Sequence, residues 1–398
     1  MANNNKHTGP NVPALRFPEF SGEWIESKLG DIADFSKGAG ISKDQRSEEG
    51  NPCILYGELY TRYKSEVITN VFSKTALPDS ELVKSKANDI IIPASGETAE
   101  DIATARCVPF DNILLGGDLN IIRLHEQDGK FFSYQLNGVR KYDIATVAQG
   151  VSVVHLHAGD LKGISVKYPS HIAEQEKISQ ILGLIDDRIA TQSKIIKELT
   201  TLRSALLEKV FQVSNPTLEV GAIAHQTSER NKLCRYSNVL SVSNRFGFIN
   251  QSEQFEDRNV ASDDVRNYKV VHRGDFAYNP ARINVGSIAM LKSFESGIVS
   301  PMYICFQVDD TIVDPSFFEL FLETKAFKDE MEIRLEGSVR RCLSFEALCE
   351  IHMPRPALLV QRSITDKIGN ISSKIKLEDR ILRAYIRQKE WLLKQMFI

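Results

Sequence analysis

Two long segments of the chain repeat one amphipathic pattern at a fixed offset. Even the polar interruptions coincide, because Gln192 matches Glu378 and Arg203 matches Lys389. Shared apolar positions are common among long helices, whereas shared interruptions indicate an internal duplication. The first apolar seam contains Ile178, Leu182, Ile185, Ile189, Ile196, Leu199, Leu206 and Val210, and the second contains Ile364, Ile368, Ile371, Ile375, Leu382, Tyr385, Leu392 and Met396.

The duplication extends, more weakly, into the segment before each helix. The frame Gly150-x5-Leu156-x4-Leu161-x2-Ile164 returns as Gly337-x5-Leu343-x4-Leu348-x2-Ile351, with an offset one position longer than that of the helices. The frames match while the surface residues between them differ. This is the pattern expected of two copies that share a scaffold but recognise different things, and it predicts pseudo-twofold symmetry.

Turn-forming residues divide the chain into alternating globules and helices. The runs between them are short and β-rich in the globules, and Pro169, Pro216 and Pro354 mark the boundaries of the helices. We therefore predict an α+β fold, in which two similar globular domains are joined by a pair of long antiparallel coiled-coil helices. The expected segments are a disordered leader at 1–14, a globule at 15–170, a helix at 171–213, a globule at 214–356 and a helix at 357–398.

Composition and charge exclude several classes of protein. The 398 residues are 42% hydrophobic, without the run of about 20 apolar residues that a membrane helix needs. The six cysteines form no Cys-x-x-Cys pair, which argues against a zinc site or a disulfide scaffold and is typical of the cytoplasm. Net charge is −3, but the segment 357–398 carries nine basic and four acidic side chains. Any nucleic-acid surface must therefore be a local basic patch.

Catalytic motifs are missing from the sequence. It contains neither a Gly-x4-Gly-Lys-Ser/Thr phosphate loop nor a Gly-x-Gly-x-x-Gly dinucleotide fingerprint. Tyr278-Asn279-Pro280-Ala281 approaches the Asn-Pro-Pro-aromatic motif of amino-methyltransferases but lacks its second proline and its aromatic residue. We therefore predict no catalytic residues and no bound metal or cofactor on this chain.

Polar loops at matching places in the two copies are the candidate recognition sites. Arg can pair with guanine and Asn with adenine, while hydroxyl and backbone N–H groups can hold phosphate. An ordinary surface turn is an equally good explanation for any one loop, but the pairing of loops favours function. The candidates are Ser95, Gly96, Thr98, Gln149, Gly150 and Ser152 in the first copy, Arg282, Asn284, Ser338, Arg340 and Arg341 in the second, and, more weakly, Lys37 and Arg245.

Two stretches resemble the specificity subunits of type I restriction–modification enzymes. The opening LRFPEFSGEWIESKLGDIADFSKG (15–38) is similar to the start of those subunits, and AEQEKISQILGLIDDRIATQSKIIKELTTLRSALLEKVF (173–211) is similar to their central conserved helix. The resemblance implies two target-recognition domains, each of which reads one half of a split double-stranded DNA site. It also implies that the helices set the spacer and dock two modification subunits.

The resemblance further implies where the chemistry of the complex resides. Modification subunits would bind S-adenosylmethionine and methylate adenine, and restriction subunits would add translocation and cleavage driven by ATP with magnesium. This chain would be a non-catalytic, cytoplasmic subunit without membrane contact. Two other classes stay open from the residues alone: an enzyme of unknown type with a duplicated fold, and a coiled-coil scaffold for proteins. The sequence does not give the DNA target, the spacer length or the register of the helix pair.

Overall fold

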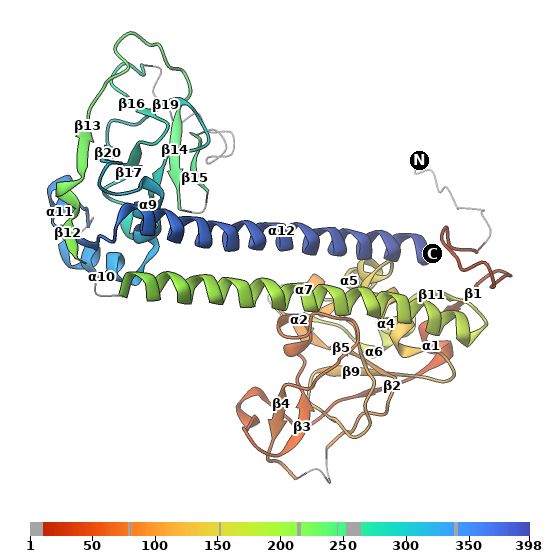
Figure 1. The fold of residues 1–398 in the computed structure, drawn as a ribbon. Helices are drawn as coiled ribbons and strands as arrows, with labels where there is room; N and C mark the ends of the chain where they lie inside the picture. Colours follow the sequence, from red (N-terminus) through yellow and green to blue (C-terminus); the bar gives the residue numbers. More distant parts are fainter. Residues whose placement is uncertain are drawn as a thin grey trace. The chain divides into compact units, whose positions relative to one another are not determined.

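The computed structural model describes residues 11–78, 80, 82–150, 153–212, 216–244, 246–251, 264–337 and 341–398. The chain divides into two compact units (Figure 1). Unit 1 comprises residues 1–194 and 379–398, and unit 2 comprises residues 195–378. Each of two long helices, α7 (Ile172–Gln212) and α12 (Leu358–Met396), contributes one part to unit 1 and the other to unit 2.

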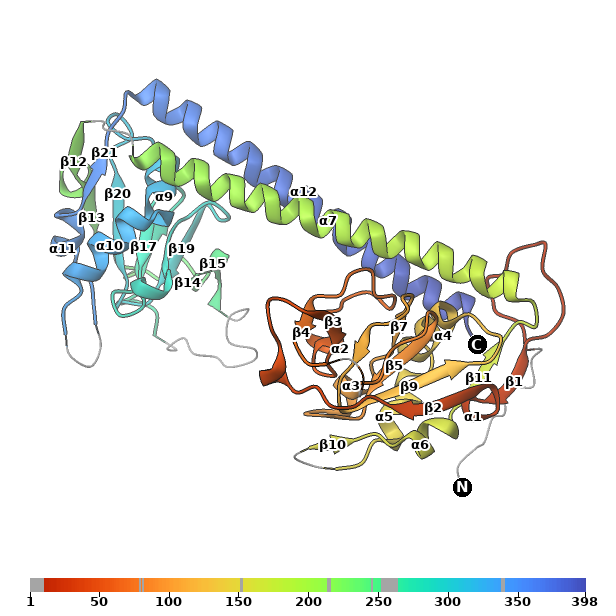
Figure 2. The ribbon, with the colours of Figure 1, turned by 90° about the horizontal axis from the view of Figure 1, so that it is seen from below.

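Unit 1 is built on an antiparallel four-stranded sheet with the order β2-β9-β5-β7 (Figure 2). The central strand β5 (Asp89–Pro93) is buried along its whole length, as its apolar run DIIIP predicts. Helix α4 (Gly129–Asn137) packs its phenylalanines into the same core as Trp24 and Ile178. The other strands of the sheet are β2 (Ala33–Lys37), β9 (Leu119–Leu124) and β7 (Arg106–Val108).

Smaller elements complete unit 1. A second sheet, in the order β4-β3-β8, forms a distal lobe. One apolar cluster joins it to the four-stranded sheet, and a smaller one lies within the lobe. The bounds are β1 (Ile25–Lys28), α1 (Leu29–Ile32), η1 (Lys43–Gln45), β3 (Asn51–Ile54), α2 (Glu58–Thr61), β4 (Ser73–Thr75), β6 (Ser95–Gly96), α3 (Ala99–Ile102), β8 (Leu114–Leu115), α5 (Lys141–Val147), β10 (Val154–His155), α6 (Ala158–Lys162) and β11 (Ser165–Tyr168).

Unit 2 repeats the same plan. Its four-stranded antiparallel sheet has the order β13-β20-β17-β18, and α9 (Pro315–Glu323) packs on it as α4 does in unit 1. Its distal lobe consists of the hairpin β14–β15 and the pair β16–β19. The bounds are β12 (Thr217–Glu219), η3 (Val220–Ala222), β13 (Ala224–Thr227), β14 (Leu240–Ser243), β15 (Gly247–Asn250), β16 (Lys269–His272), β17 (Phe276–Tyr278), η4 (Ile283–Val285), β18 (Ile288–Met290), β19 (Ser296–Val299), β20 (Ile304–Val308), α10 (Lys325–Arg334), α11 (Phe345–Cys349) and β21 (His352–Pro354).

Buried glutamines fasten a long helix to the globule in the same way within each unit. In unit 1 the Gln175 side chain accepts from the backbone N–H of Asp128 at 3.0 Å and donates to the Pro169 carbonyl at 3.0 Å. In unit 2 Gln361 accepts from Asp314 N–H at 2.8 Å and donates to the Pro356 carbonyl at 2.8 Å. Asp128 and Asp314 in turn cap the N-termini of α4 and α9.

A glycine is also duplicated at one close approach. A Cβ atom at Gly30 would lie 2.8 Å from Lys162 Cβ, and one at Gly221 would lie 2.9 Å from Cys349 Cβ. Both distances are below normal van der Waals contact, so only glycine lets each short helix approach its neighbour. These matched details confirm the predicted α+β fold with internal duplication.

The long helices pair antiparallel within each unit, as predicted. The buried seam residues of unit 1 lie at the start of α7 and at the end of α12: Ile178, Leu182, Ile185, Leu392 and Met396. In unit 2 the seam is buried at Ile368, and most other seam residues are half-buried. Near the end of α7 the structure differs from the prediction, because Leu206 is exposed and Leu207 is buried. In unit 2 the register places Ser372 opposite Arg203, at 2.8 Å. This contact excludes a register that would place Glu378 opposite Arg203.

The first globule begins earlier than predicted. Asn11 accepts a hydrogen bond from Trp24 N–H at 2.7 Å and another from the Lys167 ammonium at 2.9 Å. The Leu15 N–H donates to the Gln395 carbonyl at 2.8 Å. The predicted leader thus includes a stretch, 11–14, that the structure places against unit 1, while residues 1–10 lie outside the described ranges.

Candidate nucleic-acid interface

The structure brings the two predicted loops of unit 1 together. Strand β6 pairs with β10, so that Ser95 lies opposite His155 and Gly96 opposite Val154. Gln149 forms two backbone hydrogen bonds with His155, at 2.9 and 2.7 Å. Candidate residues that are distant in the sequence therefore share one surface at the end of β5.

Several of these candidates serve the fold of the loops themselves. The Thr98 hydroxyl accepts from Asp101 N–H at 3.1 Å and so caps α3, and the Ser95 side chain is buried. Gly150 has a φ of +124°, a conformation that side-chain-bearing residues rarely adopt. The Gln149 side chain is exposed and remains available to a ligand. Lys37 is also exposed, at the end of β2.

The sequence did not predict two residues beside these loops, the exposed His155 and the half-buried Tyr60. His155 is exposed, although a single histidine is more often structural, and its ring stacks with that of His157 at 6.4 Å between centroids. Tyr60 lies nearby, because a Cβ on Gly96 would lie 3.9 Å from its hydroxyl. Burial raises the pKa of Tyr60, and Tyr56, Asp101 and Glu97 raise it further, so it stays a neutral hydrogen-bonding group. Alternating polar and apolar residues around His155 were the only local signal.

Unit 2 joins its two predicted loops through the same backbone bond. The Leu343 N–H donates to the Pro280 carbonyl at 3.2 Å, just as the Leu156 N–H donates to the Ala94 carbonyl at 2.9 Å in unit 1. Gly337, like Gly150, has a positive φ, of +105°. The correspondence between the two sequence frames therefore holds at the level of single hydrogen bonds.

A polar hollow of about 310 Å³ adjoins the first loop of unit 2. Arg282 lines it with an exposed guanidinium, and Asn284 is exposed beside it. The Asn279 side chain is held in place, because its oxygen accepts from Ala281 N–H at 3.1 Å. Amide and hydroxyl groups dominate the lining, and Val285 and Met302 form an exposed apolar rim. The lining residues are Ser241, Val242, Asn244, Gln251, Tyr268, Asn279, Arg282, Val285, Ser287, Ser300, Met302 and Tyr303.

The remaining candidates divide into one that is engaged and four that cannot be placed. The Arg341 guanidinium contacts the Glu332 carboxylate at 2.9 Å and donates to its backbone carbonyl at 2.7 Å. A ligand would have to compete with that pair. Ser152, Arg245, Ser338 and Arg340 lie outside the described residues.

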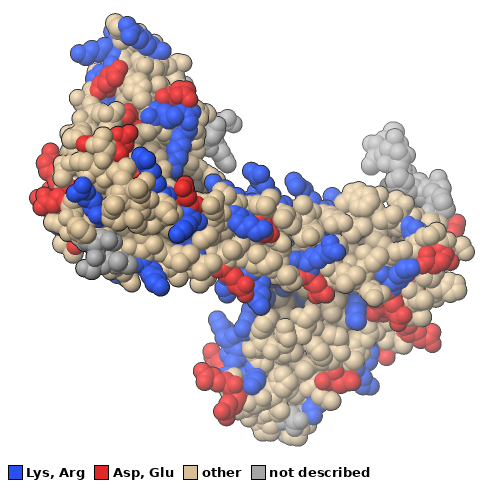
Figure 3. Space-filling view, in the orientation of Figure 1, with Lys and Arg blue, Asp and Glu red and all other residues tan. Residues whose placement is uncertain are grey.

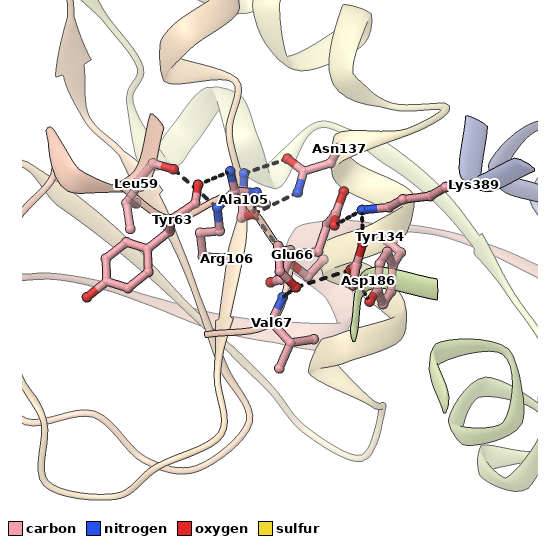
Figure 4. A network of polar contacts seen from close by, with 12 residues as sticks. Leu59, Tyr63, Glu66, Val67, Ala105, Arg106, Tyr134, Asn137, Asp186 and Lys389 are labelled. Carbon is pink, nitrogen blue, oxygen red and sulfur yellow. Dashed lines mark hydrogen bonds and ion pairs between the residues drawn. The ribbon is translucent and has the colours of Figure 1, made fainter. Parts of the chain in front are cut away.

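A buried polar network anchors the globule of unit 1 to the helices (Figure 4). The ammonium of Lys389 contacts the carboxylates of both Glu66 and Asp186. The Tyr134 hydroxyl donates to Asp186 Oδ2 at 2.7 Å. Burial, followed by the nearby charge of Asp186, raises the pKa of Glu66 above its ordinary value, against the opposing effect of Lys389. Burial likewise lowers the pKa of Arg106, which bonds to the carbonyls of Leu59 and Tyr63.

Comparison with known proteins bears directly on this duplicated arrangement. Residues 21–201 match the type I restriction modification DNA specificity domain. Residues 21–201 therefore belong to the type I restriction–modification specificity family. Across 92% of its length the chain is 22% identical to the specificity subunit of the type I restriction enzyme MjaVIII of Methanocaldococcus jannaschii, 89% of which is covered.

Solved structures of this family share the fold. The specificity subunit of M. genitalium superposes with a TM-score of 0.63 at 18% identity, covering 97% of this chain and 99% of that one. A second chain, from work on complex assembly and conformational transition of the type I restriction–modification system, gives a TM-score of 0.54 at 13% identity, covering 94% and 97%. Membership of the specificity family assigns the chain a role in DNA recognition.

Two features are absent from the described residues. Among them, no helix is long and apolar enough to cross a membrane. Within the same ranges, no group of three or more His, Cys, Asp or Glu side chains is arranged to hold a metal ion.

Proposed function

We propose that each unit reads one half of a bipartite double-stranded DNA site. The observation that carries this proposal is that two units with the same sheet order present different side chains at the same pair of loops. A shared scaffold keeps the mode of docking, while different loop residues select different bases. One chain can thereby specify two unrelated half-sites.

The loop of unit 2 has the chemistry for direct base readout. A guanidinium can donate two hydrogen bonds to the O6 and N7 atoms of guanine, and a side-chain amide can pair with adenine. Arg282 and Asn284 are exposed on the same short loop, beside a hollow rich in amides. Gln149 and Lys37 are the exposed candidates in unit 1, and Ser95, Gly96, Thr98 and Gly150 shape the loop that presents them.

We also propose that α7 and α12 set the distance between the half-sites and dock two modification subunits. Long paired helices are stiff, and α12 carries the basic excess of the chain. The chain itself contributes recognition and no chemistry. S-adenosylmethionine would be bound by the modification subunits, and ATP and magnesium by restriction subunits.

Genome-wide mapping of methylated adenines tests the proposal. Cells that contain the modification subunits should methylate one split motif when this chain is present and lose that methylation when it is deleted. The purified chain alone should transfer no methyl group from S-adenosylmethionine. Methylation of a single continuous motif, or methyl transfer by the isolated chain, would contradict the proposal.

A further inference from the structure

A basic hollow lies in the distal lobe of unit 1, and none of its lining residues belongs to the paired recognition loops. It measures about 370 Å³ and is lined by three cations, Lys43, Arg46 and Lys74. Phe72 forms an apolar part of its wall and is 51% exposed. In Figure 3, Lys and Arg side chains lie beside Asp and Glu side chains at the edge of unit 1 that carries β3 and β4. The lining also includes the carboxylate of Glu48, so cations outnumber carboxylates in the hollow itself.

The backbone beneath these cations is firmly held. Ser42 and Gln45 form a capping box around η1, which carries Lys43. The Ser47 N–H donates to the Lys74 carbonyl at 2.9 Å, so the two sides of the hollow are joined by a backbone bond. The hollow is therefore part of the fold of the lobe, and its cations project from fixed positions.

The two lysines differ from the arginines nearby. Arg62 and Arg46 face the buried carboxylate of Glu58, at 3.0 and 4.0 Å. Among the described residues, no carboxylate forms an ion pair with Lys43 or Lys74, although Glu48 also lines the hollow. Within those ranges, the two lysines thus carry positive charge that the fold does not neutralise.

The chemistry of the hollow favours a phosphate over a base. Lysine ammonium groups are flexible point charges, which attract phosphate but do not match the edge of one particular base. The Ser47 and Ser73 hydroxyls are already engaged, by the Glu49 carbonyl and by Glu58. Few directional groups are left in the hollow to discriminate between bases.

We propose that this hollow binds the DNA backbone, with Lys43 and Lys74 each neutralising a phosphate. The exposed ring of Phe72 would pack against the adjacent deoxyribose. The ring itself contacts the guanidinium of Arg62, 4.9 Å from the ring centroid, and the ring of Tyr63. The inference rests on the proposed function and adds to it a contact that positions the duplex without reading its sequence.

The test measures how binding by the assembled modification complex depends on salt. Two unmethylated duplexes are compared: one contains the motif that the complex methylates, and the other lacks it. Each phosphate contact contributes about 0.9 to the slope of log K against log salt. The double variant Lys43→Gln/Lys74→Gln should therefore make this negative slope shallower by about 2 for both duplexes. It should also weaken the binding of both duplexes by the same factor. The methylated motif should stay unchanged.

The control variant is Lys28→Gln/Lys162→Gln, which removes the same charge from exposed positions on β1 and α6. It should keep the slope of the unmodified complex, and thermal unfolding of both variants establishes that they fold. An unchanged slope in the first variant would overturn the inference, as would a changed motif. Loss of modification-subunit binding in place of DNA binding would mean that the hollow docks a protein, which also overturns it. If the complex with the wild-type chain binds the two duplexes with equal affinity, the proposed function fails instead.

Discussion

Lys389 on α12 places its ammonium nitrogen 2.6 Å from Asp186 Oδ1 on α7. The offset that relates the two helices converts this pair into Arg203 on α7 and Ser372 on α12, which lie 2.8 Å apart in unit 2. In both units the cation also reaches a carboxylate of the globule, Glu66 for Lys389 and Glu323 for Arg203. Arg203 and Lys389, one matched pair of polar interruptions, therefore both fasten a globule to the helix pair in a fixed register.

Replacement of Lys389 by methionine should destabilise unit 1 by about 3–5 kcal/mol, because two buried carboxylates lose the ammonium group that contacts both of them. Both tryptophans, Trp24 and Trp391, lie in unit 1, so urea unfolding followed by tryptophan fluorescence reports on this unit. The matched control is Lys394→Met on an exposed face of α12. Equal unfolding midpoints and slopes for the two variants would show that the network contributes no stability.

Replacement of Glu66 by glutamine should remove part of the pH dependence of stability. A carboxyl whose pKa is raised on folding binds its proton more tightly in the folded state. Its contribution to stability is therefore present at low pH and is lost as pH rises from the ordinary value of 4.5 through the raised pKa. The free energy of unfolding of the unmodified chain should fall relative to Glu66→Gln across that window. Parallel curves would mean that the folded pKa is not raised.

Loss of the buried glutamines should weaken each unit at the same place. Gln175→Ala and Gln361→Ala each leave a partly buried backbone N–H without its side-chain partner, at a cost of about 1–3 kcal/mol. Hydrogen exchange should become faster at the start of α4 in the first variant and at the start of α9 in the second. The exposed Gln180→Ala and Gln388→Ala serve as controls on the same two helices. A variant that accelerates exchange in the wrong unit, or in neither, would refute the equivalence of the two glutamines.

The repeated helices were predictable because periodicity is a local property of the sequence. Even there, the strict heptad selected Leu206, whereas the structure buries Leu207. A straight helix drifts by about 20° per heptad, so a seam extrapolated over several heptads ends on the neighbouring residue. The bounds of α7 and α12 follow from Pro169, Pro216 and Pro356, which interrupt helices.

The recognition surfaces were predictable only in part. Pairing of Ser95 with His155 joins loops that are far apart in the sequence, and the duplicated frame was the only hint of it. The basic hollow had no sequence signal, because Lys43 and Lys74 are brought together by a backbone bond between loop and hairpin. The sequence also could not reveal that Arg341 is engaged by Glu332, since that pair depends on the folding of the loop onto α10.

Lengthening the helix pair should lengthen the spacer of the DNA site. Four residues inserted after Leu199 and four after Lys376 add about 6 Å to each helix while roughly keeping its apolar face. The two positions lie near one another in the register set by Arg203 and Ser372. We expect the same half-sites with a spacer longer by roughly one or two base pairs, as determined by methylation mapping. New half-sites with an unchanged spacer would show that the helices do not set the distance.

The most direct test of one reader per unit is methylation mapping of variants altered in a single unit. Arg282→Ala/Asn284→Ala should relax or change the bases in one half of the motif and leave the other half and the spacer intact. Lys37→Ala/Gln149→Ala should affect only the opposite half. Loss of an Arg contact to guanine corresponds to about 1–3 kcal/mol of discrimination at one base position. Changes in both halves from either variant, or in the same half from both, would contradict the account.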